Sequence, residues 1–378
     1  MIAMKLGWLV LECLFLGFFL YFGSSGALAL AVVLVLIPMA SVPVNLVLRK
    51  SIEVSVDVPG SLRKGDEGSI IVKLRNPTLL PAFKVVCQIT VDNQLNRERM
   101  DQRLYTYVFP LKEQHSALQV KSQYCGRLRI RVEKLKLYDC FGLIGIPCNA
   151  SARGYVTVQP ETFEPVVQLT PNPSSTDDSD AYSQSRPGFD LTETYQIREY
   201  TPGDSPKQIH WKLTGKLDRL VVRDPGLPIT RNVLVFWERT GETGDPALID
   251  AQAEVVISLC RSLMVSGIQF TLAWNNTQQN QLVRHFLKDM DELVAVIHRL
   301  LRAAGAKDSV SGATLLLQTG ADALCGHMVY IAQEPQSDVM ELRRYGHVTM
   351  LLCGEIPLEG AVRFDPYDYP QQLAQIEI

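Results

Sequence analysis

Two long apolar runs open the chain, Met4–Gly23 and Ala27–Leu48, and only a short Ser-Ser-Gly segment separates them. A helix of about 20 residues rises about 30 Å, which is the thickness of the hydrocarbon core of a bilayer. Backbone inside a bilayer must satisfy its own hydrogen bonds, and this favours a helix for each run. The pattern therefore predicts a transmembrane helical hairpin over residues 1–50, with the second helix bent or shortened by Pro38 and Pro43.

Basic residues flank this hairpin on one side only. Lys5 lies in the first turns of the first run, and Arg49 and Lys50 follow the second. Because basic flanks stay on the cytoplasmic side, the sequence predicts a multi-pass cell-membrane protein with two helices and with both termini and the soluble domains in the cytoplasm. The alternative is a cleavable signal peptide, since Ala27–Ala29 resembles a cleavage site, but another apolar run follows that site instead of a polar mature domain.

Glu12 lies inside the first run, where a charged carboxylate is costly and often functional. Two interpretations stay open: a functional group, or a protonated side chain bonded to a neighbouring helix or an oligomer partner. The second is favoured because no other acidic residue accompanies Glu12 among residues 1–48.

After the apolar runs, the hydrophobic period changes to two. Ile52–Val58, Ser69–Leu74 and Gly126–Val132 alternate apolar and polar residues, and Gly-rich or Pro-containing turns separate them. Short alternating strands of this kind predict an antiparallel β-sandwich over residues 51–169. Residues 170–187 are rich in Pro, Ser and Asp and are expected to form a flexible linker.

The last part of the chain alternates strand-like and helix-like segments, which predicts a parallel α/β sheet over residues 229–378. Helices are expected at Pro246–Gly267, Met290–Ala304 and Val339–Tyr345. Strands are expected at Val233–Phe236, Ile268–Trp274, Ala313–Gln318, Met328–Ala332 and His347–Cys353.

The charge composition argues against binding of nucleic acid. The 378 residues carry 37 Lys and Arg against 40 Asp and Glu, a net charge of −3, which does not suit a protein that binds nucleic acid through bulk positive charge. Arg127, Arg129 and Arg131 share one strand face, but the stacking aromatics of a single-strand binder are absent there. No nucleic-acid partner is therefore expected.

The most distinctive segment, residues 188–228, precedes the α/β region. It contains Arg-Glu-Tyr-Thr-Pro-Gly-Asp at Arg198–Asp204 and Lys-Gln-Ile-His-Trp-Lys at Lys207–Lys212, while Tyr-Asp-Cys-Phe-Gly-Leu stands earlier at Tyr138–Leu143. These motifs resemble the signature of the domain-of-unknown-function 58 family of bacterial membrane proteins. Ile197, Lys207 and His210 depart from the family's usual Leu, Arg and acidic residue. The candidate interaction or structural residues are Arg198, Glu199, Tyr200, Pro202, Gly203, Asp204, Trp211 and Lys212.

Elementary chemistry suggests a local structure for this signature. Pro202-Gly203 suits a tight turn, and Asp204 is expected to cap a short helix that starts at Ser205-Pro206 and ends at Gly215.

Side chains of the signature are also expected to interact with one another. Arg198 and Glu199 are expected to pair with Asp204 and Lys212. Ile209 and Leu213 are four residues apart and should face inward together. The segment is then either a docking surface or, as we favour, an ion-paired connector between the two soluble domains.

The resemblance further implies that the α/β region is a von Willebrand factor A-like, Rossmann-like domain, a fold that binds a divalent ion through Asp-x-Ser-x-Ser. The corresponding residues here are Glu238, Thr240 and Glu242, with Arg239 between them. Magnesium needs compact octahedral oxygen geometry, which long Glu side chains and a neighbouring cation disturb. We therefore expect no cofactor. Binding of Mg²⁺ by these degenerate ligands is the disfavoured alternative.

Short catalytic motifs for phosphate binding, zinc hydrolysis or serine nucleophiles are missing from the sequence. The expected function is a non-enzymatic, membrane-anchored scaffold or adaptor. Family resemblance implies a MoxR-type AAA+ ATPase as partner and, in some cases, a transglutaminase-like membrane protein. The alternative is a metal-dependent ligand-binding module, and an envelope-related enzyme is the third hypothesis.

Overall fold

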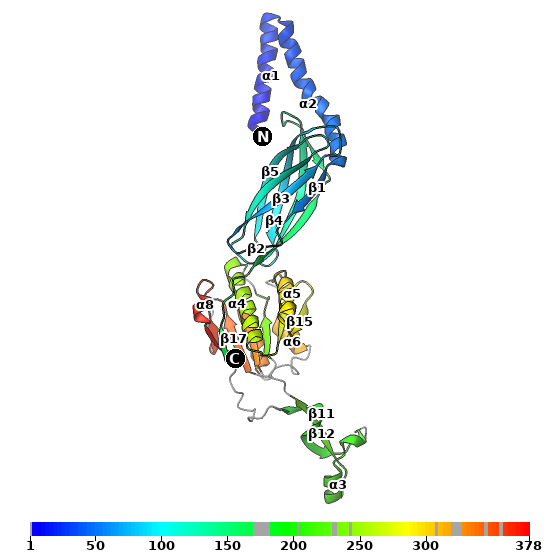
Figure 1. Cartoon of the computed structure of the whole chain (residues 1–378), viewed down its shortest axis with the longest axis vertical. Helices are drawn as coiled ribbons and strands as arrows, with labels where there is room; N and C mark the ends of the chain where they lie inside the picture. Colours follow the sequence, from blue (N-terminus) through cyan, green and yellow to red (C-terminus); the bar gives the residue numbers. More distant parts are fainter. Residues whose placement is uncertain are drawn as a thin grey trace. The chain divides into compact units, whose positions relative to one another are not determined.

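The computed structural model places the chain in two compact units, residues 1–161 and 162–378 (Figure 1). The described residues are 2–168, 182–202, 204–228, 233–241, 244–306, 309–318, 327–343, 347–354 and 358–378.

The first unit begins with two apolar helices, α1 (Ile2–Phe22) and α2 (Ser25–Ser51), which lie side by side in Figure 1. Gly23 has a φ of 62°, so the turn between them uses the left-handed backbone that glycine adopts without strain. Both helices are long and apolar enough to cross a membrane. Helix α2 continues through Pro38 and Pro43 for 27 residues, so the expected shortening is wrong.

Two β-sheets follow α2. The first has the order β1 (Glu53–Asp57), β3 (Glu67–Arg75), β6 (Glu113–Lys121) and is antiparallel. The second has the order β2 (Ser61–Arg63), β9 (Ala152–Gln159), β7 (Gly126–Tyr138), β4 (Ala82–Asn93), β5 (Arg99–Val108), and β8 (Gly145–Cys148) pairs with β7. Only the short β2–β9 pairing is parallel among the described strands of this unit.

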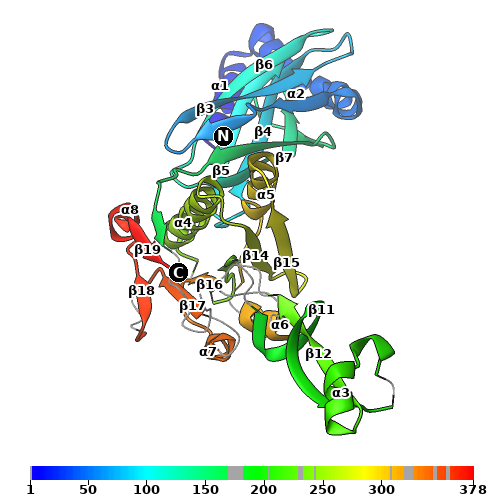
Figure 2. The same cartoon turned by 60° about the horizontal axis from the view of Figure 1, so that its bottom comes forward.

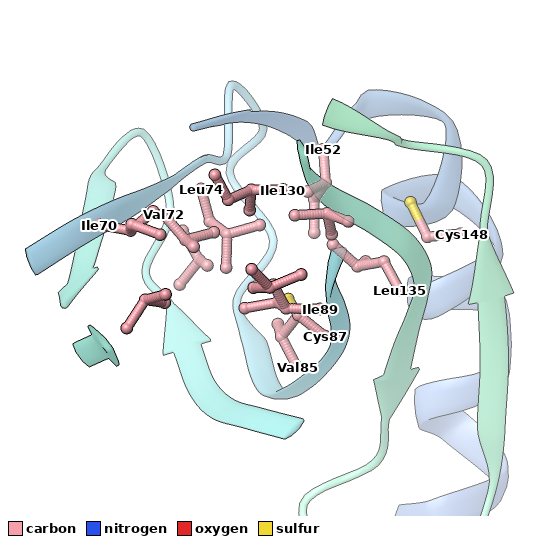
Figure 3. Close-up of a cluster of buried hydrophobic side chains, with 14 of the residues drawn as sticks. Ile52, Ile70, Val72, Leu74, Val85, Cys87, Ile89, Ile130, Leu135 and Cys148 are labelled. Atoms are coloured by element: carbon pink, nitrogen blue, oxygen red, sulfur yellow. The ribbon is translucent and has the colours of Figure 1, made fainter. Parts of the chain in front are cut away.

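One apolar cluster joins the two sheets and the end of α2 (Figure 3). Ile70 and Val72 on β3 are fully buried with Ile130 on β7, as the period of two predicts. Leu48 and Ile52, at the end of α2, belong to the same cluster. Helix α2 is therefore continuous with the core of the β-sandwich.

The second unit holds a six-stranded sheet. Its order is β15 (Gln281–Leu287), β14 (Phe270–Asn276), β13 (Val233–Trp237), β16 (His327–Ala332), β17 (His347–Leu352), β18 (Ala361–Arg363). Neighbouring strands are parallel except β15, which runs antiparallel to β14 at one edge. Helices accompany the strands: α4 (Pro246–Val265), α5 (Met290–Leu300), α6 (Gly312–Gln318), α7 (Val339–Leu342) and α8 (Tyr369–Gln372). A short parallel pair joins β10 (Val166–Gln168) to β19 (Gln375–Glu377).

Two features of this sheet differ from the sequence prediction. Residues 313–318 form helix α6 instead of a strand. A short apolar run fits a buried strand and a buried helix equally well, so periodicity alone does not separate them. Strand β15 had not been expected at all.

The segment that carries the Arg198–Asp204 and Lys207–Lys212 motifs forms a two-stranded antiparallel pair, which we call the signature arm. Strands β11 (Tyr182–Glu199) and β12 (Val221–Pro228) pair antiparallel, and the 3-10 helix η1 (Pro206–Gln208) and helix α3 (Trp211–Leu217) connect them (Figure 2). Strand β11 starts inside the range expected to be a linker, of which residues 170–181 lie outside the described residues.

Candidate functional site

Arg198 is the centre of the signature arm. Its two terminal nitrogens donate to the two carboxylate oxygens of Asp204, each at 2.8 Å, and its Nε donates to Asp224 Oδ2 at 3.1 Å. Two-pronged guanidinium–carboxylate pairs of this kind are strong and fix the orientation of both side chains. The Arg198 guanidinium accordingly holds the pKa of the Asp204 carboxyl well below its usual value. The expected Arg198–Asp204 pair is confirmed.

Asp204 closes a turn instead of capping a helix. Its Oδ2 accepts hydrogen bonds from the backbone N–H of Thr201 at 2.8 Å and from the Thr201 hydroxyl at 3.0 Å. The backbone N–H of Asp204 donates to the Thr201 carbonyl at 3.1 Å. Pro202 is exposed within this turn, and Gly203 lies outside the described residues. The predicted helix cap is therefore wrong, although the predicted turn is present.

Helix α3 begins at Trp211, later than expected. The Nδ1 atom of His210 accepts from the backbone N–H of Leu213 at 3.3 Å, so His210 takes the place of the usual Asp or Ser cap. The helix runs past Gly215 and stops at Asp218, whose φ is 51°. His210 therefore caps α3, because one imidazole nitrogen can accept a hydrogen bond.

Glu199 pairs with Arg219 instead of with Lys212, which is exposed. Tyr200 donates its backbone N–H to the carbonyl of Leu220 at 3.1 Å and extends the pairing of the two strands. Sequence reasoning did not predict that Arg219 and Asp224 belong to this site. Asp224 is brought beside Arg198 by the pairing of Val221–Asp224 with Gln196–Glu199, and the Val-Val-Arg-Asp sequence carries no alternating pattern that would have indicated it.

The arm leaves several apolar side chains in solvent. Trp211, at the first position of α3, is 67% exposed, and Ile197, Leu217 and Leu220 are about half exposed. Ile209 and Leu213 are half buried, in line with the expected inward-facing pair. A framework fixed by ion pairs thus presents a large exposed aromatic side chain.

The candidate metal ligand Glu238 follows β13 and is buried. Its Oε1 accepts from the backbone N–H groups of Thr240 and Gly312, both at 3.1 Å, and its Oε2 accepts from Ala313 N and Tyr330 Oη, both at 3.2 Å. Both oxygens are therefore used to hold the first turn of α6. Burial, together with this carboxylate, raises the pKa of Tyr330 well above its usual value.

The second candidate ligand, Thr240, is held in the same way. Its hydroxyl donates to the carbonyl of Val310 at 3.1 Å and accepts from Asn275 Nδ2 at 2.7 Å. Arg239, which is fully buried, places its guanidinium over the ring of Trp237 at 3.9 Å. The third candidate, Glu242, lies outside the described residues. Glu238 and Thr240 are brought together by the structure, but as supports of the α6 loop.

A cavity of about 720 Å³ opens where strands β16, β17 and β18 end and α4 begins. Asp245, Glu334, Asp365 and Arg363 line it. Asp245 accepts from Ala247 N at 2.9 Å as the cap of α4, and Arg363 donates to the carbonyl of Gly354 at 3.0 Å. These polar groups hold the surrounding loops and leave a polar cavity of mixed charge.

The buried thiol of Cys353 lies near this cavity. Burial, with the carboxylates of Asp365 and Asp245 adding to it, raises the pKa of Cys353 to about 12. A thiol that stays protonated at neutral pH is a poor nucleophile.

The earlier motif, Tyr138–Leu143, forms the loop between β7 and β8. Asp139 is fully buried, and its carboxylate accepts from Phe141 N at 3.0 Å and Ile144 N at 2.7 Å. Gly142 has a φ of 69°, a conformation that a side chain would strain. The motif is therefore a locally capped turn.

Comparisons with known proteins do not identify a family for this chain. No family model matches the chain, and no curated protein matches it. A CARDB domain of the PF1109 protein from Pyrococcus furiosus, solved with di-metal ions, is 13% identical with a TM-score of 0.23 and covers 29% of this chain and 88% of that domain. A cohesin module from a Clostridium perfringens family 33 glycoside hydrolase is 7% identical with a TM-score of 0.23 and covers 30% and 99%.

A β-glucosidase from Listeria innocua is 12% identical with a TM-score of 0.20 and covers 29% of this chain but 16% of the enzyme. Scores this low carry no argument about this chain. The domain-of-unknown-function 58 resemblance and the von Willebrand A-like identity of the second unit therefore stay predictions.

Proposed function

We propose that this chain is a non-enzymatic, membrane-anchored scaffold or adaptor whose signature arm binds a protein partner. The observation that carries the proposal is the exposure of Trp211 on an arm fixed by the Arg198, Asp204 and Asp224 ion pairs. Exposed aromatic residues on preordered surfaces are typical anchors of protein interfaces, because little conformational entropy is lost on binding.

In this proposal α1 and α2 cross the cell membrane, and both termini and both soluble units face the cytoplasm. The length and hydropathy of the two helices support the crossing, and Lys5, Arg49 and Lys50 support the orientation. Green fluorescent protein and alkaline phosphatase, each fused after Ile378, test the sidedness. Fluorescence without phosphatase activity is expected, and the reverse result would overturn the cytoplasmic assignment.

The partner is proposed from the family resemblance. A MoxR-type AAA+ ATPase is the first candidate, and a transglutaminase-like membrane protein is the second. The strand order of the second unit, with β13 between β14 and β16, supports a doubly wound domain of the von Willebrand A type. No cofactor is required for this function.

Co-purification tests the partner. The full-length chain, solubilised in mild detergent, should retain a MoxR-type ATPase from the same cells, and Trp211→Ala should reduce the amount retained severalfold. The matched control is Tyr367→Ala, which removes another highly exposed aromatic side chain outside the arm. Equal loss with both variants, or no retention by the native chain, would remove the arm–ATPase proposal.

A further inference from the structure

One end of the β-sandwich is attached directly to the membrane helix. Helix α2 ends at Ser51 and β1 begins at Glu53, so no flexible spacer separates them. Leu48 and Ile52 are buried in the sandwich core, and the thiol of Cys148 on β8 donates to the carbonyl of Arg49 at 3.0 Å. The sandwich is therefore held at a fixed position against the last turns of α2.

Strand register shows which loops lie at this end. Glu53, the first residue of β1, pairs with Arg75 at the end of β3, and Arg75 pairs with Glu113 at the start of β6. In the other sheet, Ala82 pairs with Val108. Loops 76–81 and 109–112 therefore lie beside the end of α2. Loop 139–144 joins them, because Tyr138 pairs with Lys84 at the start of β4 and with Gly145.

These loops, together with Phe83 at the start of β4, expose large apolar side chains. Leu79 is 78% exposed, Leu111 64%, Phe109 59% and Phe83 57%, and Ile144 is also exposed. Leaving such side chains in water is unfavourable, and a contiguous apolar surface generally marks a contact with a protein or a membrane. We call these five residues the juxtamembrane surface.

Hydrogen bonds hold loops 76–81 and 109–112 together. Leu111 N donates to the carbonyl of Thr78 at 3.0 Å, and Asn76 N donates to the carbonyl of Lys112 at 3.0 Å. Asn76 is buried, and its side chain donates to the carbonyl of Leu80 at 2.7 Å while accepting from Thr78 N at 3.0 Å. The exposed side chains are therefore presented by a built surface.

Charge and aromatic placement at this end suit a lipid headgroup layer. Lys50 and Lys112 are exposed beside the surface, and basic residues favour anionic headgroups. Tyr107 packs its ring against Phe109 at 5.1 Å between centroids, and tyrosines favour the boundary between hydrocarbon and water. Two acidic residues at this end are paired: Glu53 with Arg75 at 3.5 Å and Glu113 with His115 at 3.1 Å.

The opposite end of the sandwich differs. Its loops 94–98 and 122–125 carry Gln94, Arg97, Glu98 and Gln123, and Leu95 between them is buried. The exposed apolar loops are thus confined to the end that the membrane helix enters.

We propose that the juxtamembrane surface inserts into the interfacial layer of the lipid bilayer, so that the sandwich is a second membrane contact beside the helical hairpin. This inference rests on the proposed crossing of the membrane by α1 and α2. It assigns a role to the Asp139 loop, which holds Ile144 at the same end. It also implies that the sandwich has a fixed orientation on the membrane.

Tryptophan quenching by brominated lipid tests the inference. The full chain carrying Trp8→Phe is reconstituted into phosphatidylcholine–phosphatidylglycerol vesicles, with or without brominated phosphatidylcholine. Leu79→Trp is added at the juxtamembrane surface, and Gln123→Trp at the opposite end is the matched control. Phe109→Trp is a second, more conservative probe should Leu79→Trp not fold.

The added Leu79→Trp or Phe109→Trp emission should shift to shorter wavelength and be lost in brominated vesicles, whereas the Gln123→Trp emission should do neither. Emission from both ends that is equally unquenched overturns the inference. A shift without quenching also overturns it and shows that protein, such as a second copy, covers the surface. Resistance of the chain to alkaline extraction is measured on the same vesicles: a chain that resists extraction but is not quenched leaves the proposed anchoring intact, while an extracted chain overturns both.

Discussion

The β7–β8 loop and the end of strand β13 each bury a carboxylate that accepts backbone N–H groups, but over very different sequence distances. Asp139 accepts from Phe141 and Ile144, which are two and five residues away. Glu238 accepts from Gly312 and Ala313, which are more than seventy residues away. One carboxylate shapes its own loop, and the other fastens a helix to a strand.

This difference shows when the role of a buried carboxylate can be predicted from the sequence. The sequence singles out the Asp139 motif only through the family resemblance, although an aspartate that accepts from N–H groups two and five residues later makes a local contact that a short pattern can encode. Glu238 has one local partner, the N–H of Thr240, but its other partners are brought to it by the fold. The von Willebrand A-like resemblance makes Glu238 a degenerate candidate metal ligand, whereas in the structure both of its oxygens accept hydrogen bonds from the first turn of α6.

The largest effect should come from Glu238→Ala. This change removes the carboxylate that accepts from the N–H groups of Thr240 and Gly312 and from the hydroxyl of Tyr330, while Ala313 N keeps the Ser311 hydroxyl as its acceptor. It should lower the free energy of unfolding of the second unit by about 3–5 kcal/mol. Urea unfolding followed by the emission of Trp237 and Trp274 measures it. Glu341→Ala, at an exposed glutamate of α7, is the control and should have little effect. Equal stabilities would show that Glu238 does not fasten α6.

Asp139→Ala should have a smaller and more local effect. It removes the acceptor for two backbone N–H groups of one loop, and we expect a loss of about 1–2 kcal/mol in the unfolding free energy of the first unit. Asp139→Asn keeps one acceptor oxygen and should lose less. Hydrogen exchange should rise at Phe141 and Ile144 while the strands stay protected; exchange that rises throughout β7 would contradict a purely local role.

A third carboxylate, Asp204, is only partly buried, and its ion pair makes the stability of the signature arm depend on pH. Because Arg198 lowers its pKa, the ion pair contributes stability above the ordinary pKa of about 3.9, and that stability is lost as the pH falls through the lower folded value. Protease cleavage within the arm should therefore increase at acidic pH. Asp204→Asn should be cleaved readily at neutral pH and show no such step.

The smallest effect is expected from metal. Since the oxygens of Glu238 and the hydroxyl of Thr240 are already hydrogen-bonded, Mg²⁺ or Ca²⁺ should not raise the thermal midpoint of the second unit. A rise that disappears in Thr240→Ala would instead restore the metal-dependent ligand-binding alternative.

Local physics let the sequence by itself determine several parts of this protein. Apolar runs long enough for a bilayer gave α1 and α2, and a period of two gave β3 and β7, because both patterns depend on neighbouring residues. The pairing of Arg198 with Asp204, six residues apart, was accessible for the same reason.

Only the tertiary structure decided the rest. The apolar segment at residues 313–318 became helix α6 because the carboxylate of Glu238, from a distant strand, accepts its first N–H groups. Glu199 pairs with Arg219 because strand β12 returns beside β11. The apolar loops at Leu79 and Leu111 gathered at the end of α2 through strand register. Each outcome depends on residues that are far apart in the chain and close in space. The local pattern of the sequence does not show which distant residues come into contact.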